Sequence, residues 1–290
     1  MSAIPHHFSV GRFRCTIIPD GVFAYEHPAT LLFADAPPSE LAQALHAHQL
    51  TPATWEHYRS PYPSLLIDTG SERVLVDTGA GALGPETGRL LPNMHAAGVA
   101  PEAIDTVILT HGHADHIGGN VTADGKPTFP RARYVMWRHE WDFWHDNPDL
   151  SSLHIPDRIK AVLIESAQRN LPPIAGQVEL VDSEGEIAPG IHAIAAPGHT
   201  PGHMALSIHS DGEQLLHLVD TVLHPIHVAH PAWVTLLDLA PAQTVATRRR
   251  LLPRAAAEQA LVLAYHFPSP GLGHVVARGD GWQWRPLHIL

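Results

Sequence analysis

The feature that most constrains this chain is a histidine-rich run, His-x-His-x-Asp-His, at residues 111–116. It follows the apolar, β-branched segment 104–109, which is typical of a buried strand. The run therefore lies where a core strand ends and a loop begins, a place where binding groups are often held. Three imidazoles and a carboxylate this close together are costly to bury unless a partner such as a divalent metal ion pairs with them. The alternative is a solvated turn, since the chain has 24 histidines.

Three further apolar segments also end in histidine or aspartate. They are residues 192–195, 215–219 and 260–264, and the polar residues that follow them are His199, Asp220 and His266. Each alone would be an ordinary residue at the end of a strand, but four such strand ends together predict a site at one edge of a sheet. His203 is an alternative to His199 as a ligand. The tighter Pro-Gly turn favours His199, and we expect His203 to support the ligands from behind.

A carboxylate, Asp77, ends another predicted strand and precedes a Gly-rich turn at residues 79–81. No Walker lysine accompanies the turn, so it is weak evidence for phosphate binding. We interpret Asp77 as a buried carboxylate that orients the metal-binding loop. The alternative is an N-cap for the next helix.

The composition is that of a soluble globular protein, with 44% hydrophobic and 16% charged residues. A net charge of −11 argues against nucleic acid and anionic membranes as partners. The one cysteine, Cys15, allows neither an intramolecular disulfide nor a multi-thiolate metal site. The start of the chain, residues 1–8, lacks the basic and apolar regions of a signal peptide, and no stretch is apolar enough to span a membrane. We therefore expect a cytoplasmic protein.

Strand and helix patterns alternate along the chain. The patterns predict a hairpin over residues 12–25 that turns at Pro19–Gly21, and a second hairpin over 64–76. Before the metal loop, part of 85–98 is predicted to be helical, with Pro92 kinking or restarting the helix, and helices over 137–145 and 157–170 follow the loop. This order favours two β-α halves that share one core, in a single domain covering residues 1–290. A Pro-flanked segment at about 28–61 is too long for a simple connection and predicts an arm or lid.

In order and spacing, these polar residues resemble the metallo-β-lactamase superfamily over about residues 60–285. The resemblance implies an α/β (α+β) fold, a four-layer αβ/βα sandwich that holds two divalent metal ions at one edge. The matching positions are Asp77, His111, His113, Asp115, His116, His199, Asp220 and His266.

The resemblance also assigns the ligands to the two ions. One ion would be held by His111, His113 and His199, the other by Asp115, His116 and His266, with Asp220 bridging them. Zinc suits this set, and manganese, cobalt and iron are alternatives. A hydroxide between the ions would be the nucleophile, so no Ser or Cys nucleophile is needed. We expect Asp115 and Asp220 to be catalytic, with Asp115 orienting the hydroxide or carrying a proton.

Secondary motifs at residues 76–80, 84–85, 142–144, 198–203 and 264–274 favour the methyl parathion hydrolase type within the superfamily. That type implies an apolar, aromatic-lined pocket. The residues that match it are Leu83, Trp144, Leu223 and His274, although either leucine fits a core role equally well.

Other branches of the superfamily match less well. Gly112 stands where the glyoxalase II branch has a histidine, and His113 where the di-iron flavoproteins have a glutamate. Leu223 stands where acyl-homoserine-lactone lactonases usually carry a tyrosine.

The sequence thus predicts a dinuclear metal hydrolase for a small uncharged ester, lactone or phosphotriester. A carboxylic ester or lactone is the first choice of substrate. The alternatives are a phosphotriesterase of the methyl parathion type, an acyl-homoserine-lactone lactonase, a metal-bound effector without catalysis, and a redox di-iron protein. Family habit and the arm at 28–61 favour a homodimer.

Overall fold

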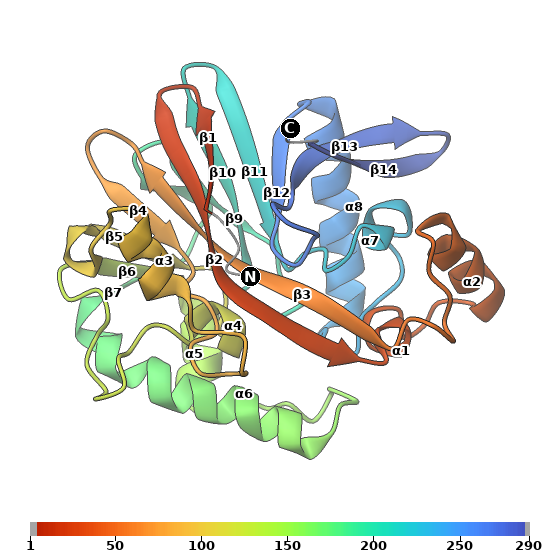
Figure 1. Ribbon diagram of the computed structural model, residues 1–290, viewed down its shortest axis with the longest axis horizontal. Helices are drawn as coiled ribbons and strands as arrows, with labels where there is room; N and C mark the ends of the chain where they lie inside the picture. Colours follow the sequence, from red (N-terminus) through yellow and green to blue (C-terminus); the bar gives the residue numbers. More distant parts are fainter. Residues whose placement is uncertain (1–4, 288–290) are drawn as a thin grey trace.

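The computed structural model describes residues 5–287, which form two seven-stranded β-sheets. One buried cluster draws side chains from both sheets, such as Ile17 and Ile108 from the first and Leu206 and Leu263 from the second. The sheets therefore pack face to face, and helices cover their outer faces (Figure 1). This arrangement is the predicted four-layer αβ/βα sandwich, so the predicted fold is confirmed. Residues 1–4, on which part of the signal-peptide prediction rests, lie outside the described residues.

The first sheet has its strands in chain order, and β4 to β7 run parallel to one another while β1 to β4 are antiparallel. The strands are β1 (His6–Val10), β2 (Phe13–Glu26), β3 (His57–Asp68), β4 (Arg73–Val76), β5 (Thr106–Leu109), β6 (Arg133–Trp137) and β7 (Val178–Val181).

The second sheet is antiparallel except where β11 pairs with β12. Its strands are β8 (Gly185–Ala188), β9 (Ile191–Ala195), β10 (Met204–Ser210), β11 (Glu213–Val219), β12 (Leu261–Ala264), β13 (Leu272–Arg278) and β14 (Gly281–Pro286). The parallel pair matters for the site, because β11 and β12 send Asp220 and His266 to the same sheet edge.

Helices cover the outer face of each sheet. Residues of α3, α4, α5 and α6 join the cluster on the first sheet, and residues of α8 join the cluster on the second. None of the helices within residues 5–287 is long and apolar enough to cross a membrane. The helices are α1 (Pro28–Leu32), α2 (Pro38–Ala47), α3 (Leu90–Ala96), α4 (Ala114–Ile117), α5 (Arg138–His145), α6 (Asp157–Asn170), α7 (Ile226–Ala229) and α8 (Pro241–Ala257), with short 3₁₀ turns at Pro101–Ala103 and Pro172–Gln177.

The arm predicted at 28–61 consists of α1, α2 and the residues that lead to β3, which begins at His57. Its apolar side chains, such as Phe33 and Trp55, pack on Leu223 and Trp233 from the chain after β11. The arm therefore covers the segment that follows Asp220. Its role in a homodimer stays a prediction.

One local prediction was wrong for a physical reason. Residues 12–25 are not a hairpin, because β2 continues through Pro19–Gly21 with an irregular register and pairs with β3 on both sides of it. The Asp20 carboxylate is buried and accepts the backbone N–H groups of Ala80 and Leu90 at 3.0 and 2.9 Å, so it serves packing rather than a turn.

The helix predicted in part of 85–98 is α3, which begins at Leu90. Pro92 lies in its first turn, where a proline is tolerated, so the helix starts near Pro92 and is not kinked by it.

Candidate metal centre

The metal centre is built from the ends of four strands. His111 and His113 follow β5 in an extended loop, and the short helix α4 then carries Asp115 and His116. The residues that follow β9, β11 and β12 supply His199, Asp220 and His266. All seven side chains are buried, with exposed fractions of at most 8%.

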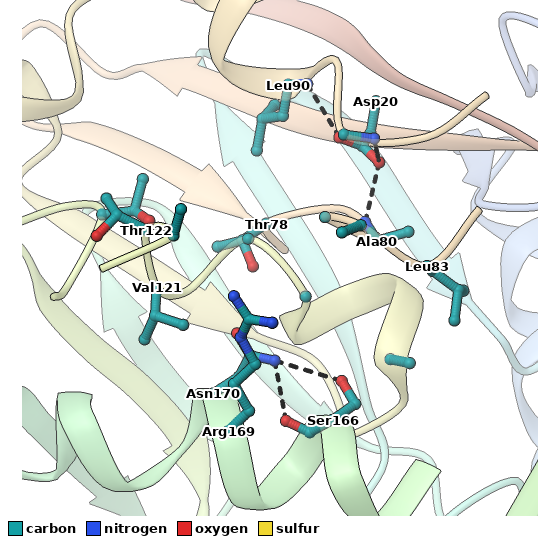
Figure 2. Close-up of a pocket in the computed structure, with 18 of the residues that line it drawn as sticks. Asp20, Thr78, Ala80, Leu83, Leu90, Val121, Thr122, Ser166, Arg169 and Asn170 are labelled. Carbon is teal, nitrogen blue, oxygen red and sulfur yellow. Dashed lines mark hydrogen bonds between the residues drawn. The ribbon is translucent and has the colours of Figure 1, made fainter. Parts of the chain in front are cut away.

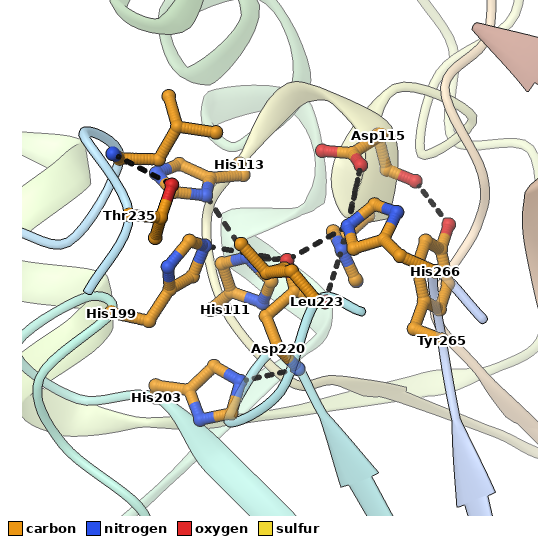
Figure 3. A network of polar contacts seen from close by, with 12 residues as sticks. His111, His113, Asp115, His199, His203, Asp220, Leu223, Thr235, Tyr265 and His266 are labelled. Carbon is orange, nitrogen blue, oxygen red and sulfur yellow. Dashed lines mark hydrogen bonds and ion pairs between the residues drawn. The ribbon is translucent and has the colours of Figure 1, made fainter. Parts of the chain in front are cut away.

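These seven residues form two adjoining groups (Figure 3). Within each group the ligand atoms lie within 4.8 Å of one another: His111, His113, His199 and Asp220 in one, and Asp115, His116 and His266 in the other. The Asp220 carboxylate joins the groups, because its Oδ2 lies 3.3 Å from His199 Nε2 and 3.0 Å from His266 Nε2. The structure thus brings together every residue that the sequence assigned to the metals, in the predicted division.

Four of the histidines are oriented in the same way, with the outer ring nitrogen engaged and Nε2 facing the centre. The Nδ1 atom hydrogen-bonds to Thr110 Oγ1 in His111, Asp77 Oδ2 in His116, Asp238 Oδ1 in His199 and Ser60 Oγ in His266, at 3.2, 2.7, 3.0 and 2.9 Å. A proton held on the outer nitrogen leaves the Nε2 lone pair free, which is the form that binds a metal ion.

The inner atoms fit a metal pair rather than a hydrogen-bonded core. Among the described residues, Nε2 of His116 and of His199 and Oδ1 of Asp220 are buried and make no hydrogen bond. Buried polar atoms are rarely left unpaired. The carboxylates of Asp220 and Asp238 also overcome the effect of burial and raise the pKa of His199 to about 9. The unpaired inner atoms and the shared carboxylate therefore fit two divalent ions such as zinc.

Asp77 and His203 support the ligands without joining either group. Asp77 is fully buried and, besides His116, accepts the backbone N–H and the hydroxyl of Thr110, so it is not a helix N-cap. His203 accepts the N–H of Asp220 through Nε2 at 3.2 Å and donates through Nδ1 to Ala196 O at 3.1 Å. Burial lowers the pKa of His203 to about 3, which keeps Nε2 free to accept this bond.

Sequence reasoning missed Glu140, a fully buried carboxylate on α5. Its oxygens accept the N–H groups of Gly112 and Gly202 at 2.9 and 2.7 Å. Gly112 lies between His111 and His113, and Gly202 lies in the loop that carries His199. Glu140 therefore ties together the two loops that supply the first group of ligands.

A second missed pair is Asp238 and Arg248, both buried. Arg248 lies on α8, and its guanidinium donates to the carbonyl oxygens of Thr221 and Trp233 and lies 4.0 Å from Asp238. Asp238 in turn holds His199. Helix α8 thus fixes both the residue after Asp220 and the partner of His199.

The comparisons with known proteins decide the family. Residues 58–266 match the Metallo-beta-lactamase superfamily, which is most of the chain. The chain belongs to this superfamily. The predicted family is therefore confirmed.

Solved structures of the superfamily match the whole chain. One is AidC, described as a dizinc quorum-quenching lactonase in complex with the product N-hexanoyl-L-homoserine, with a TM-score of 0.91 and 26% identity over 100% of this chain and 99% of that one. Another is the hydrolase AbOPH of the beta lactamase superfamily, with a TM-score of 0.87, 26% identity and the same coverage.

Curated relatives match in part. An N-acyl homoserine lactonase from Bacillus sp. is 25% identical over 170 residues, which cover 50% of this chain and 57% of the relative. An atrochrysone carboxyl ACP thioesterase from Cryptosporiopsis sp. is 30% identical over 159 residues, 54% of this chain and 37% of the relative. The matched region thus spans 57% of the length of the lactonase and 37% of the length of the thioesterase.

The predicted pocket residues of this superfamily member lie in different places. Trp144 is buried beneath the metal loop, where its ring contacts His113 and its Nε1 donates to Glu140. Leu223 is also buried, beside the arm. His274 lies elsewhere: its ring bonds to Ala260 O at the start of β12, whereas the ligand His266 follows the end of that strand.

Leu83 is half-buried and lines a cavity of about 470 Å³ behind α4 (Figure 2). Thr78, Ala114 and Asn170 also line this cavity, but none of the metal ligands does. The cavity is therefore separate from the metal centre.

Proposed function

We propose that this chain is a dinuclear metal-dependent hydrolase of uncharged lactones and carboxylic esters. The observation that carries the proposal is the carboxylate of Asp220, which lies within 3.7 Å of histidines from both ligand groups. Two ions joined by one carboxylate suit hydrolysis better than a structural role, because a structural site closes its coordination with protein ligands. AidC, which overlays the whole chain, is described as a dizinc lactonase.

The chain's residues supply the surroundings that this chemistry needs. When bound, two divalent ions would acidify a water molecule and polarise the substrate carbonyl. Asp115 is the most exposed of the seven ligands, so it is the carboxylate that water reaches most easily. Its Oδ2 faces His116 and His266 at 3.7 and 3.5 Å. Among the described residues its Oδ1 makes no hydrogen bond, which leaves that atom free to hold a proton.

The distribution of charge favours a neutral substrate. Arg248 is the only lysine or arginine among the buried residues in the described part of the chain, and its hydrogen bonds go to backbone carbonyls. Among the described residues, no buried lysine or arginine side chain is therefore left to pair with a carboxylate or phosphate group of a ligand. The side chains beside the ligands include Leu223, Tyr62 and Tyr265, which suit an apolar ester or lactone.

The test is hydrolysis of four substrates by zinc-loaded protein: p-nitrophenyl acetate, dihydrocoumarin, N-hexanoyl homoserine lactone and methyl paraoxon. We expect the lactones or the aryl ester to turn over much faster than the phosphotriester. The variants His113→Ala and Asp220→Ala should be inactive, and a chelator should abolish activity that zinc then restores. Two bound ions with no turnover of any substrate would contradict the proposal and favour a non-catalytic effector.

A further inference from the structure

The ends of β2 and β3 extend beyond the sheet as a two-stranded ribbon (Figure 1). Tyr25 is paired with Tyr58, and Phe23 with Ser60. Directly paired residues, and residues two apart along a strand, lie on the same face of a ribbon. These four residues and Tyr62 therefore share one face.

That face contacts the ligand His266 at three points. Ser60 Oγ bonds to its Nδ1, the Tyr58 hydroxyl donates to its carbonyl oxygen, and the Tyr62 ring lies 5.5 Å from its imidazole ring. Tyr265 completes the layer, because its hydroxyl donates to Asp115 O at 2.6 Å. Aromatic side chains thus surround the second group.

Among these tyrosines, one hydroxyl proton has no hydrogen-bond acceptor. Tyr58 and Tyr265 both donate to backbone carbonyls. Tyr25 and Tyr62 share a single hydrogen bond between their oxygens, at 2.7 Å. Two hydroxyls have two protons, so one proton of this pair has no acceptor among the described residues.

Burial decides which hydroxyl keeps the free proton. Tyr62 is 1% exposed, and its hydroxyl has no other hydrogen-bond partner among the described residues. A buried donor left unpaired is costly, so Tyr62 donates to Tyr25. Tyr25 is only half-buried, and its own proton therefore points away from Tyr62.

Tyr25 is linked to ligands of the second group through Tyr62 and Tyr265. It packs with Phe23 and Leu83 on the outer edge of a cluster whose buried members include Tyr62 and Tyr265. Tyr265 contacts Asp115 and Tyr62 contacts His266. Those two ligands are 8% and 5% exposed, more than His111 or His199.

We infer that the Tyr25 hydroxyl donates a hydrogen bond to an acceptor oxygen of the bound lactone or ester, held in position by Tyr62. The inference rests on the proposed function and adds a substrate contact to it. The overall reaction stays a simple hydrolysis: water adds to the carbonyl carbon, the C–O bond breaks, and the alcohol oxygen keeps a proton that water supplied. Tyr25 stabilises charge or fixes orientation and ends each cycle unchanged.

The test compares Tyr25→Phe, Tyr62→Phe and the double variant. Tyr134→Phe is the matched control, because Tyr134 is a buried tyrosine in the first-sheet cluster whose hydroxyl makes no hydrogen bond among the described residues. We expect Tyr25→Phe to lower kcat/KM by about tenfold on the responsive substrate, with both zinc ions retained. Tyr62→Phe should cost less, and the double variant should be no worse than Tyr25→Phe, because Tyr62 acts through Tyr25.

Two sets of substrates identify which substrate oxygen accepts the hydrogen bond from Tyr25. If Tyr25 meets the leaving oxygen, its loss will make the rates of a series of aryl acetates depend more steeply on the acidity of the leaving phenol. If it meets the amide oxygen of an acyl side chain, its loss will affect N-hexanoyl homoserine lactone but not dihydrocoumarin. An equal loss on every substrate would place the contact at the carbonyl oxygen that they share, whereas an effect no larger than that of Tyr134→Phe would overturn the inference.

Binding of a non-hydrolysable lactam analogue of N-hexanoyl homoserine lactone, measured by calorimetry, separates this inference from the proposed function. We expect Tyr25→Phe to weaken this binding, even if the wild type hydrolyses slowly. Turnover by the wild type with unchanged kinetics and binding in Tyr25→Phe would refute the substrate contact alone. A wild type that neither binds nor hydrolyses these compounds would refute both.

Discussion

The two halves of the metal centre are held by different kinds of groups. The first half, His111, His113 and His199, is supported by the buried carboxylates of Glu140 and Asp238. The second half, Asp115, His116 and His266, is supported by Asp77 together with the hydroxyl groups of Ser60, Tyr58 and Tyr265.

Exposure singles out Asp115 of the second half rather than a whole half. Asp115 is 8% exposed, His113 and His266 are both 5% exposed, and the other ligands are at most 2% exposed. The first half is thus fixed through the backbone of its own loops, and the second half is covered by a ribbon that also carries Tyr25. This difference suggests that the first half mainly holds its ion, while the second half also meets the substrate.

The largest effect should come from Asp220, which both halves share. Asp220→Ala removes a ligand next to both groups, so we expect kcat/KM to fall by about a thousandfold or more. Metal analysis of the purified variant should show less than two ions per chain. If Asp220→Ala retains both ions, metal binding in the two halves does not depend on this carboxylate.

Glu140→Gln should disturb the first half alone. Its side-chain amide has one acceptor oxygen for two loops, so one of the N–H groups of Gly112 and Gly202 loses its partner. We expect unfolding free energy to fall by about 1–3 kcal/mol, measured by denaturant titration. Competition with a chromogenic chelator should show a lower affinity for one ion and an unchanged affinity for the other. An equal loss of affinity for both ions would contradict the division into halves.

Asp238→Asn and Asp77→Asn test how far the support of the two halves is separate. Asp238 holds His199 in the first half, whereas Asp77 holds His116 directly and reaches His111 through the Thr110 hydroxyl. We expect Asp238→Asn to lower the affinity for the first ion alone by about 10–100-fold, and Asp77→Asn to lower the affinity for the second ion most and for the first ion less. Chelator competition measures both affinities. A lower affinity for the second ion in Asp238→Asn would be incompatible with separate support of the halves.

His224 offers a test of pH dependence outside either half. Burial lowers the pKa of His224 to about 3, below the usual value of 6.5. The unfolded chain takes up a proton below pH 6.5 that the folded chain refuses, so stability is full above that pH and falls between about 6.5 and 3. This residue contributes a slope of at most about 1.4 kcal/mol per pH unit.

His224→Asn keeps an acceptor for the N–H of Ile226 but does not titrate in this range. We expect the variant to have a shallower loss of stability below pH 6.5 in denaturant titrations. An unchanged slope would show that His224 takes up its proton in the folded protein as well.

The smallest expected effect is that of Ser60→Ala. It removes the hydrogen bond between the Ser60 hydroxyl and Nδ1 of His266. The binding free energy of the second ion should fall by about 1 kcal/mol, while that of the first ion stays unchanged. Chelator competition measures both. A lower affinity for the first ion in Ser60→Ala would mean that the ribbon supports both halves.

The ligands were predictable because each follows an apolar strand, and parallel strands bring their ends to one edge. His111, Asp220 and His266 illustrate this pattern, and the division into two groups came from the resemblance to the family. Helix α6 and strand β7 also have the predicted limits, whereas strands β1, β10, β13 and β14 and helix α8 were not predicted.

The supporting groups could not be predicted, because their partners lie far along the chain. Glu140 contacts Gly112 and Gly202, which are 28 and 62 residues away, and nothing in its own helix marks it. The same holds for Tyr62, whose neighbour Tyr25 is 37 residues away. The false hairpin at Pro19–Gly21 has a related cause: the residues are typical of a turn, but Asp20 binds the distant loop at Ala80 instead.

The most direct test of a two-ion hydrolase is a zinc titration of the metal-free protein, with lactone hydrolysis followed at each addition. We predict that activity stays low after the first equivalent of zinc and rises to its maximum with the second. Full activity with one ion bound, or activity that survives complete removal of metal, would contradict the two-ion centre.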